Sequence, residues 1–503
     1  MAASAILLPP SPTPPSYHRI VSPTLTIPSD PLSSIPVGLL ACQRDPLLRE
    51  LDTTVVSCTI SQSGPPPSSR TGKKAPVAAA PEHPTLEVIL HDTVIFPEGG
   101  GQPSDIGILK TTDGRIWTVF QVKRLGGHAI HYVRVDNAET DSLQFVPGTK
   151  IHVALGDEGI ERRLDHMSIH TSQHLLSAVL ESQFNLPTLS WGMSAYPAPC
   201  YVELPRSMNI DEIQSVQAEA NKYVFEGRQV YVEVQELSQA QLPGVEKLEN
   251  GRSINKALPA DYTGGIMRVV VIDGIDRSPC CGTQLPTLHN LQLFVLPHTE
   301  AMSRSSTTSA RLYFLAGPRL ITYLSNTHSQ LTSAAALLSC GLPVVPDRLG
   351  QVLDDRKKAE KSVDDLKIEL AKFVAKEILQ DIQNAHEDPL FVKHIHRTDD
   401  LVNPLGFLSA VASAFSGLVS TKSSHVIILS SSPSSQTSSS TSVVLVFGLE
   451  EKRVKEAGEQ LKSKLGVKGG GKGPRWSGKF VGVWKEGRED AAVADILEAI
   501  AGQ

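Results

Sequence analysis

The residues of this 503-residue chain best suited to chemistry are a histidine pair and a distant cysteine. His170 and His174 lie four positions apart, so on a helix they project from one face, about 6 Å apart, as a divalent metal ion requires. Cys280, in the run PCCGTQ at 279–284, can complete such a site, because zinc accepts imidazole and thiolate together. Either signal alone is weak, since paired histidines also pack in cores and buried cysteines behave as small hydrophobes. Their combination predicts a zinc site.

Two further residues narrow the chemistry. Thr171 stands where a zinc peptidase has the glutamate that serves as its general base, which argues against peptide hydrolysis. Gln284 stands where a fourth ligand is expected, and its amide oxygen is a weaker, harder ligand for zinc. An open coordination position is typical of a catalytic zinc site rather than a structural one.

A glycine-rich segment at 96–107 (FPEGGGQPSDIG) is the second candidate binding feature. Successive backbone N–H groups of Gly99, Gly100 and Gly101 can cradle an anion such as a phosphate. Taken alone, the segment reads more simply as a tight turn between two strands.

The elements that must position these residues follow from periodicity. Short β-rich runs separated by turns predict a small β-barrel over 37–155. A helix over 164–182 carries the histidines, and a strand over 266–272 precedes the cysteine. Together with a helix over 210–226, this order predicts an α/β domain with an antiparallel sheet over 156–300, and the whole chain is expected to be an α+β multidomain protein.

The remaining segments are assigned by composition. The Pro- and Ser-rich stretches 1–36 and 62–84 are expected to be disordered, and so is the serine run 430–442. Apolar residues spaced three and four apart predict a linker and helical coiled-coil arm within 301–385, which either packs on its own protein or forms a homodimer. A C-terminal α/β domain is expected over 386–503.

Bulk properties limit the setting. The net charge of −6 gives no general attraction to nucleic acid, and no apolar run approaches the roughly 20 residues that span a bilayer. Six scattered cysteines do not resemble a disulfide scaffold. We therefore expect a cytoplasmic protein without a membrane partner. A mitochondrial presequence is the alternative, although the proline-rich start disfavours its amphipathic helix.

The C-terminal domain carries a local basic patch. Between 451 and 488, eleven Lys and Arg face four Glu, a net +7. Lys468, Lys472 and Arg475 are candidate nucleic-acid contacts, and Trp476 and Trp484 could stack on bases. The run GVKGGGKG at 466–473 nearly matches a phosphate-binding loop, but a glycine replaces its Ser/Thr, so ATP binding is not expected.

The three motifs together resemble the alanyl-tRNA editing family. HTSQH at 170–174 and CCGTQ at 280–284 are similar to that family's metal motifs, usually H-T-x-x-H and C-x-G-T-H, and 96–107 is similar to its glycine loop. The resemblance, of the longer AlaX type, implies that His170, His174 and Cys280 bind Zn²⁺. The family's fourth ligand, a histidine, falls on Gln284; water or His289 could take its place.

The resemblance also implies a function. It is hydrolysis of the ester that joins a wrong amino acid, chiefly serine and also glycine, to the alanine tRNA. Gln102 and Thr171 are candidate catalytic residues, and the glycine loop with Asp105 is a candidate substrate-binding segment. The C-terminal glycine run is similar to a DHH-associated domain, which implies tRNA binding. The alternatives are a tRNA-binding relative that has lost its metal, and a zinc hydrolase acting on another ester or amide.

Overall fold

The computed structural model describes residues 12–62, 83–237, 262–301, 309–385, 390–419 and 424–502. The chain forms two compact units, Met1–Ser333 and Ala334–Gln503. The predicted disordered insertion at 62–84 falls almost entirely outside the described residues. Among the described helices, none is long and apolar enough to cross a membrane.

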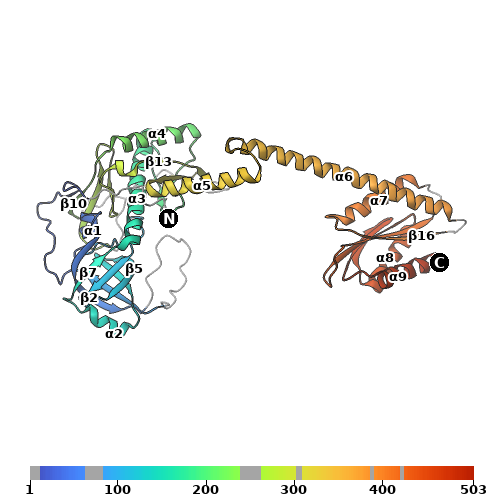
Figure 1. Ribbon diagram of the computed structural model, residues 1–503, viewed down its shortest axis with the longest axis horizontal. Coiled ribbons are helices and arrows are strands. Elements are labelled where there is room, and N and C mark those ends of the chain that lie inside the picture. Colours follow the sequence, from blue (N-terminus) through green and yellow to red (C-terminus); the bar gives the residue numbers. More distant parts are fainter. Residues whose placement is uncertain are drawn as a thin grey trace. The chain divides into compact units, whose positions relative to one another are not determined.

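A closed six-stranded antiparallel barrel forms the lower part of the first unit in Figure 1, as the strand spacing predicted. Its strands, in spatial order, are β2 (Glu50–Ile60), β3 (Thr85–Leu90), β6 (His128–Arg134), β5 (Ile116–Leu125), β4 (Gly107–Thr111) and β7 (Lys150–Ala154). Apolar side chains alternate into the interior, where Val88, Val119 and Val153 are fully buried. Closure leaves the barrel no free edge to aggregate. A short helix, α2 (Ala138–Ser142), precedes β7.

The α/β part of this unit is built around α3 (Gly156–Phe184), which lies between the barrel and α4 (Ile210–Glu226) in Figure 1. One sheet has the order β1–β10–β11–β12, and the other β13–β15–β9–β8 with β14 beside β15. The strand bounds are β1 His18–Ile20, β8 Ser190–Gly192, β9 Cys200–Leu204, β10 Val230–Glu236, β11 Ile266–Ile272, β12 Asp276–Pro279, β13 Phe294–Val295, β14 Thr299–Ala301 and β15 Ala310–Ala316. Because β15 pairs with β9, this part continues past the predicted boundary at 300.

The prediction of a disordered tail over 1–36 is wrong for residues 12–36. Strand β1 pairs in parallel with β10, and Tyr17 is buried beside it. Ile35 and Val37 are buried as well, and they lead into α1 (Ala41–Arg44). A few apolar residues anchor this segment, although its average composition is that of a disordered chain.

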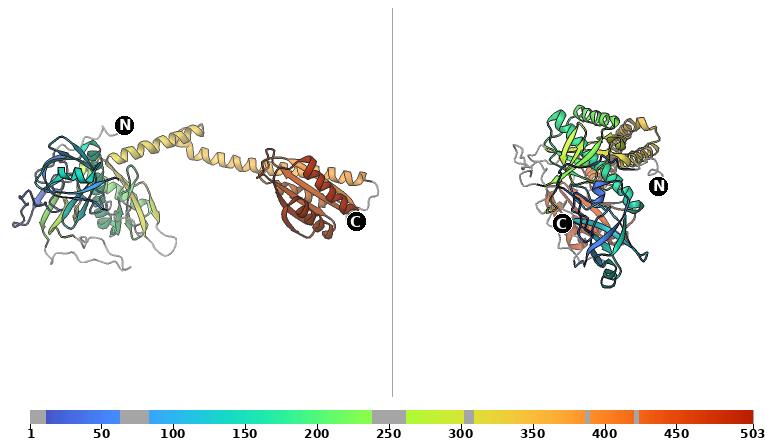
Figure 2. Two further views of the ribbon diagram at one scale, coloured as in Figure 1. Left: turned by 90° about the horizontal axis from the view of Figure 1, so that it is seen from below. Right: turned by 90° about the vertical axis from the view of Figure 1, so that its left-hand side faces the viewer.

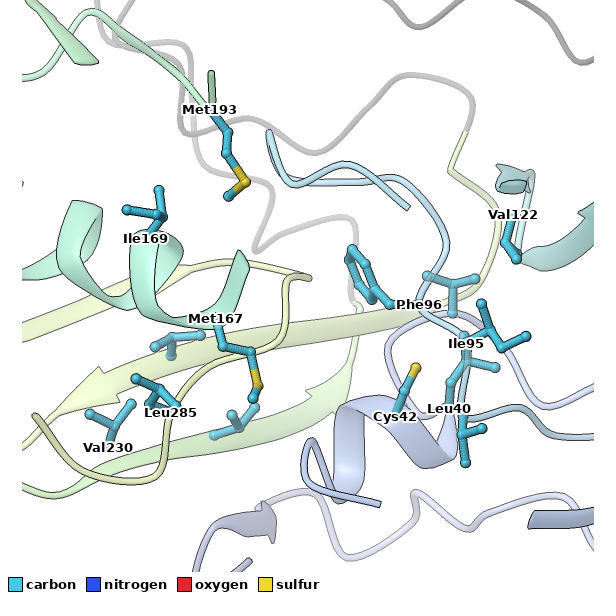
Figure 3. Packing of buried hydrophobic residues seen from close by; sticks show 14 of the residues in the cluster. Leu40, Cys42, Ile95, Phe96, Val122, Met167, Ile169, Met193, Val230 and Leu285 are labelled. Atoms are coloured by element: carbon cyan, nitrogen blue, oxygen red, sulfur yellow. The ribbon is translucent and has the colours of Figure 1, made fainter. Parts of the chain in front are cut away.

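One core continues from the barrel into the α/β part. The loop between β3 and β4 of the barrel carries the glycine-rich segment and is called the barrel loop. Figure 3 shows Leu40 and Cys42 of the α1 region close to Ile95 and Phe96 of this loop. On α3, Met167 and Ile169 belong to the same buried cluster. The two parts can be followed from two further sides in Figure 2. Because this core is shared, the barrel loop and α3 are held in a fixed relation.

Two helices follow. Helix α5 (Gly317–Leu337) crosses the boundary between the units, and α6 (Val345–Asn384) lies wholly in the second. The helical prediction for the arm is confirmed. Within the second unit, Ala371, Ala375 and Ile378 of α6 pack against α7, whereas Val363, Leu366 and Phe373 of the predicted apolar stripe are exposed. A homodimer through this stripe stays a prediction.

The C-terminal domain is a five-stranded sheet with helices on both faces, as Figure 1 shows. The strands, in spatial order, are β16 (Phe391–Thr398), β17 (His425–Ser432), β18 (Thr441–Gly448), β20 (Arg475–Val481) and β19 (Lys468–Lys472). Helices α6 and α7 (Pro404–Leu418) cover one face, and α8 (Glu451–Leu465) and α9 (Ala491–Ala501) cover the other.

The predicted disordered serine loop at 430–442 is wrong. Ser430 belongs to β17 and Ser442 to β18, and both are fully buried. Between the strands, the Ser434 amide donates to Asp400 Oδ1 at 2.9 Å, and Gln436 Oε1 accepts from the Trp484 amide at 2.6 Å. The Ser430 hydroxyl has partners in the strand interior, since its Oγ lies 2.8 Å from His394 Nε2 and 2.7 Å from His396 Nδ1, and composition alone does not reveal such partners.

Candidate metal centre

His170, His174 and Cys280 come together where α3 meets the loop after β12. Each offers one ligand atom, and these atoms all lie within 4.8 Å of one another. The two imidazole rings stack with centroids 5.3 Å apart, as the four-residue spacing predicted, and His170 Nε2 lies 3.2 Å from Cys280 Sγ. The sequence therefore identified three residues that the fold assembles.

Each histidine is oriented by an acceptor on its other ring nitrogen. His170 Nδ1 donates to Gln102 Oε1 at 2.9 Å, and His174 Nδ1 donates to Asp276 Oδ2 at 3.0 Å. Both Nε2 atoms are thus directed at Cys280. His174 Nε2 is buried and has no hydrogen-bond partner among the described residues. Metal-binding histidines adopt this arrangement: one ring nitrogen donates to a carboxylate, and the other is left without a protein partner and can bind the ion.

The electrostatics fit a cation. Burial by itself would raise the pKa of the Cys280 thiol, but His170 and His174 beside it bring that pKa well below its usual value. Burial likewise opposes the protonation of His174, but the Cys280 thiolate and Asp276 raise its pKa to about 10. The cluster therefore favours a thiolate beside positive charge, and a thiolate with two imidazoles is a donor set that zinc accepts.

Gln284 is fully buried at the edge of the cluster. Its Nε2 lies 3.8 Å from Cys280 Sγ, and its Oε1 accepts a hydrogen bond from Thr171 Oγ1 at 2.8 Å. Position 284 is therefore close enough to matter to a bound ion, and whether Gln284 is a ligand stays a prediction. The alternative ligand His289 is wrong, because its side chain is exposed and lies beside Gly227, outside the cluster.

Thr171 and Gln102 are both fully buried. Thr171 Oγ1 also accepts from the Leu285 amide at 3.0 Å, and Gln102 bonds both the amide and the hydroxyl of Thr283. These contacts make them positioning residues for the loop at 280–285, and their assignment as catalytic stays a prediction.

The glycine loop of the barrel, residues 96–107, packs directly on the cysteine loop, residues 279–284. Gly100 and Gly101 have φ values of +60° and +83°, which L side chains rarely adopt. A Cβ at Gly100 would lie 3.2 Å from Cys281 Sγ, and one at Gly101 would lie 2.7 Å from the Trp191 ring. The three sequence motifs therefore meet at one place, and glycine is required there for close approach.

Gly282 shows why the cysteine motif contains a glycine. A Cβ at this position would lie 2.1 Å from His170 Cε1, so no other residue fits without moving the imidazole. Arg268 of β11 holds the same loop from behind through the carbonyls of Cys280 (2.8 Å) and Gly282 (2.6 Å). The backbone of the cysteine loop is thus fixed by α3 on one side and by β11 on the other.

Asp105 lies in the interior rather than at an open surface. It is fully buried, forms an ion pair with Arg163 of α3, and accepts from the Phe96 amide at 2.8 Å. These contacts close the glycine loop onto α3. Its predicted role in substrate binding has no support in these contacts.

Sequence reasoning missed three residues of the site: Asp276, Arg268 and Trp191. The Trp191 ring lies 4.9 Å from that of His170 and forms one wall beside the glycine loop. Asp276 lies four positions before Cys280 in the sequence. An acidic residue a few positions before a candidate ligand was the one signal that could have identified it.

In the C-terminal domain, Lys468 and Lys472 are exposed on the edge strand β19, and Arg475 follows on β20. The glycine run lies within β19 and forms a hairpin with β20, a geometry unlike the loop-to-helix turn of a phosphate-binding loop. The prediction that Trp476 and Trp484 are available to stack on bases is wrong, because both are buried in the domain core.

The class of this protein is identified by two features together: a histidine–cysteine cluster in an α/β domain, and a small β-barrel whose glycine loop packs on that cluster. No protein-family model matches the chain. The Saccharomyces cerevisiae protein named "Putative alanyl-tRNA editing protein alaX" is 28% identical over 491 residues, covering 93% of this chain and 98% of its own. "Alanyl-tRNA editing protein Aarsd1" of Bos taurus is 31% identical over 334 residues, covering 66% of this chain and 67% of its own. The chain belongs to the alanyl-tRNA editing protein family.

A synthetase shares part of the chain. "Alanine--tRNA ligase" of Thermococcus kodakarensis is 26% identical over 298 residues, which is 59% of this chain but only 30% of the ligase. The similarity to the ligase thus involves less than a third of that enzyme.

Proposed function

We propose that this protein is a trans-acting deacylase that hydrolyses mischarged alanine tRNA at a zinc ion held by His170, His174 and Cys280. The observation that carries the proposal is the convergence of these three side chains with the glycine loop, in a chain of the alanyl-tRNA editing family. In the reaction, water adds to the ester carbonyl, the ester C–O bond breaks, and the amino acid and the ribose hydroxyl are released. Such a protein would act in the cytoplasm, where tRNA is charged.

A zinc ion in this cluster would orient the aminoacyl end or polarise a water molecule. The chain's own residues prepare the site. Gln102 and Asp276 keep both ring Nε2 atoms directed at the centre. Trp191 covers one side of His170 and limits solvent access. The glycine loop would meet the terminal nucleotide or its phosphate through backbone N–H groups other than that of Gly99, which donates to the Gln102 carbonyl at 3.1 Å.

The substrate class follows from what an alanine-selecting site cannot do. A small apolar pocket discriminates poorly against an analogue that differs by one hydroxyl or one methyl, so serine and glycine are the expected errors. A second hydrolytic site removes them. We propose serine as the principal substrate amino acid, with glycine as a second.

The exposed cations of the β19–β20 hairpin are the proposed contact with the tRNA backbone. Each phosphate contact that is lost should make the slope of log binding constant against log salt concentration shallower by about one unit. The double substitution Lys468→Ala/Lys472→Ala should therefore weaken tRNA binding at low salt and flatten its salt dependence. Lys357→Ala/Lys358→Ala, an equal change of charge on exposed residues of α6, is the control.

Deacylation of serine-charged alanine tRNA tests the activity. Cys280→Ala should lower the rate about 100-fold or more and remove bound zinc. Cys340→Ala, a cysteine outside the cluster, is the control. Full activity in Cys280→Ala would refute the zinc mechanism.

The same assay separates the alternatives. Binding of the tRNA without turnover by the wild-type protein would favour a relative that has lost catalysis. Equal rates on serine esters of unrelated tRNAs would favour a hydrolase that does not recognise the alanine tRNA.

A further inference from the structure

A second cluster of potential metal ligands lies in the C-terminal domain, outside the site described above. His394 and His396 project from the same face of β16, since alternate residues of a strand share a face. Asp490 lies immediately before α9, which packs against β16. One ligand atom from each of the three residues lies within 4.8 Å of the other two, and all three side chains are half-buried.

The distance between the His394 and Asp490 side chains fits two ligands of one ion. Nδ1 of His394 lies 3.8 Å from Oδ1 of Asp490, which is too far for a hydrogen bond. Two atoms bonded at about 2.0–2.2 Å to one shared ion lie about 3–4 Å apart, and this pair falls in that range. The geometry is therefore that of two groups facing a common position.

Neighbouring residues hold these groups in place. Ser430 Oγ lies 2.8 Å from His394 Nε2, which leaves Nδ1 of the same ring facing Asp490. Trp484 Nε1 donates to Asp490 Oδ1 at 2.7 Å, and the Trp484 ring stacks on His396 with centroids 4.9 Å apart. Hydrogen bonds and stacking of this kind orient ligands around a metal.

We propose that His394, His396 and Asp490 bind a divalent metal ion of the zinc type. Two imidazoles and one carboxylate suit zinc and similar ions, whereas calcium and magnesium prefer oxygen ligands. The ion would connect edge strand β16 to the start of α9 and stabilise this domain. His396 would exchange one of its serine hydrogen bonds, at 2.7 Å to Ser430 or 2.9 Å to Ser432, for the ion.

The same residues include a Ser–His–Asp order, Ser430–His394–Asp490, but this does not make a hydrolase. Ser430 is fully buried and its hydroxyl lies near both histidines. A nucleophile must reach a substrate carbonyl, and this hydroxyl has no surface from which to do so. Metal binding needs only passage of an ion, for which the half-buried side chains suffice.

Metal content of the purified full chain, dialysed against zinc and then against buffer, tests the proposal. The wild type should retain about two equivalents, one in each cluster. Asp490→Asn keeps the oxygen that accepts from Trp484 but removes the charge, and should reduce the content to about one equivalent. His289→Ala, an exposed histidine outside both clusters, should retain both.

The two clusters can be told apart in one experiment. Cys280→Ala should remove the other equivalent, and with cobalt it should abolish the thiolate charge-transfer absorption that Asp490→Asn leaves intact. Loss of metal on Asp490→Asn alone would support this site even if the deacylase site failed. Unchanged metal content in both Asp490→Asn and His394→Gln would overturn it.

A second readout is the thermal unfolding of the C-terminal domain. Zinc should raise its transition temperature in the wild type, because an ion that binds only the folded state stabilises that state. The shift should persist in Cys280→Ala and disappear in Asp490→Asn. A shift that survives in Asp490→Asn would contradict the assignment.

Discussion

The Oε1 atom of Gln102 accepts a hydrogen bond from His170 Nδ1 at 2.9 Å and thereby connects the barrel loop to the helix that carries the histidine pair. The same oxygen accepts from the Thr283 amide at 3.1 Å, in the cysteine loop. One buried amide thus joins all three motifs. It fixes the tautomer of His170 and the position of the ligand loop together.

Replacing Gln102 should therefore weaken metal binding without exposing any ligand. We expect Gln102→Ala to reduce zinc affinity about 10- to 100-fold, the usual effect of removing a residue that orients a ligand. Competition with a chromophoric chelator measures this affinity. Gln183→Ala, an exposed glutamine at the end of α3, is the control. Equal affinity in Gln102→Ala and wild type would show that the hydrogen bond does not orient His170.

Substitutions at position 284 test whether the fourth place around the ion belongs to the protein. Gln284→His should raise zinc affinity about tenfold or more, because imidazole is a better zinc ligand than an amide. Gln284→Ala should change the affinity little if water fills the position. Chelator competition and deacylation rate are measured on the same preparations. If Gln284→His binds zinc no more tightly than wild type, the side chain at 284 does not reach the ion.

Asp105 provides a prediction about stability rather than activity. Asp105→Asn leaves the guanidinium of Arg163 buried without its counter-charge, which typically costs about 3–5 kcal/mol. The first unit should unfold at a lower temperature, with no change in the KM of the protein that remains folded. Asp113→Asn, an exposed carboxyl on the barrel, is the control. A raised KM with unchanged stability would restore Asp105 to substrate binding.

The sequence predicted what depends on local spacing. The histidine pair, the helix that carries it, and the barrel strands follow from periods of 3.6 and 2 residues. The strand at 266–272 was predicted at its observed bounds, Ile266–Ile272. The pairing with Cys280 came from chemistry, since zinc accepts both kinds of ligand.

What could not be predicted depends on contacts between distant residues. Asp276 orients His174, and Asp105 serves Arg163, through partners that no local pattern identifies. Tyr17 is buried in a segment whose average composition indicated disorder, and Trp476 is buried in one whose charge indicated exposure. A single packed side chain can outweigh the composition of its neighbours, so averages over a window fail at such positions.

The pH dependence of barrel stability should follow His131. His131 lies on β6, between β3 and β5, and its side chain is fully buried. Its Nδ1 donates to the Val88 carbonyl at 3.0 Å, and its Nε2 accepts from the Thr93 hydroxyl at 2.9 Å. Burial lowers its pKa to about 4, whereas an unfolded histidine has a pKa of about 6.5. Between these values the unfolded chain binds a proton that the folded barrel does not.

The free energy of unfolding of the barrel should therefore be fully retained above about pH 6.5 and should fall as the pH is lowered toward 4, by on the order of 3 kcal/mol at most. Hydrogen exchange of the β3 and β6 amides, measured from pH 7 to 5 and corrected for intrinsic rates, reports it. His131→Gln can form both hydrogen bonds but cannot gain the proton, so its slope should be smaller by about one proton. His128→Gln, exposed on the same strand, should keep the wild-type slope; a wild-type slope in His131→Gln as well would place the titrating group elsewhere.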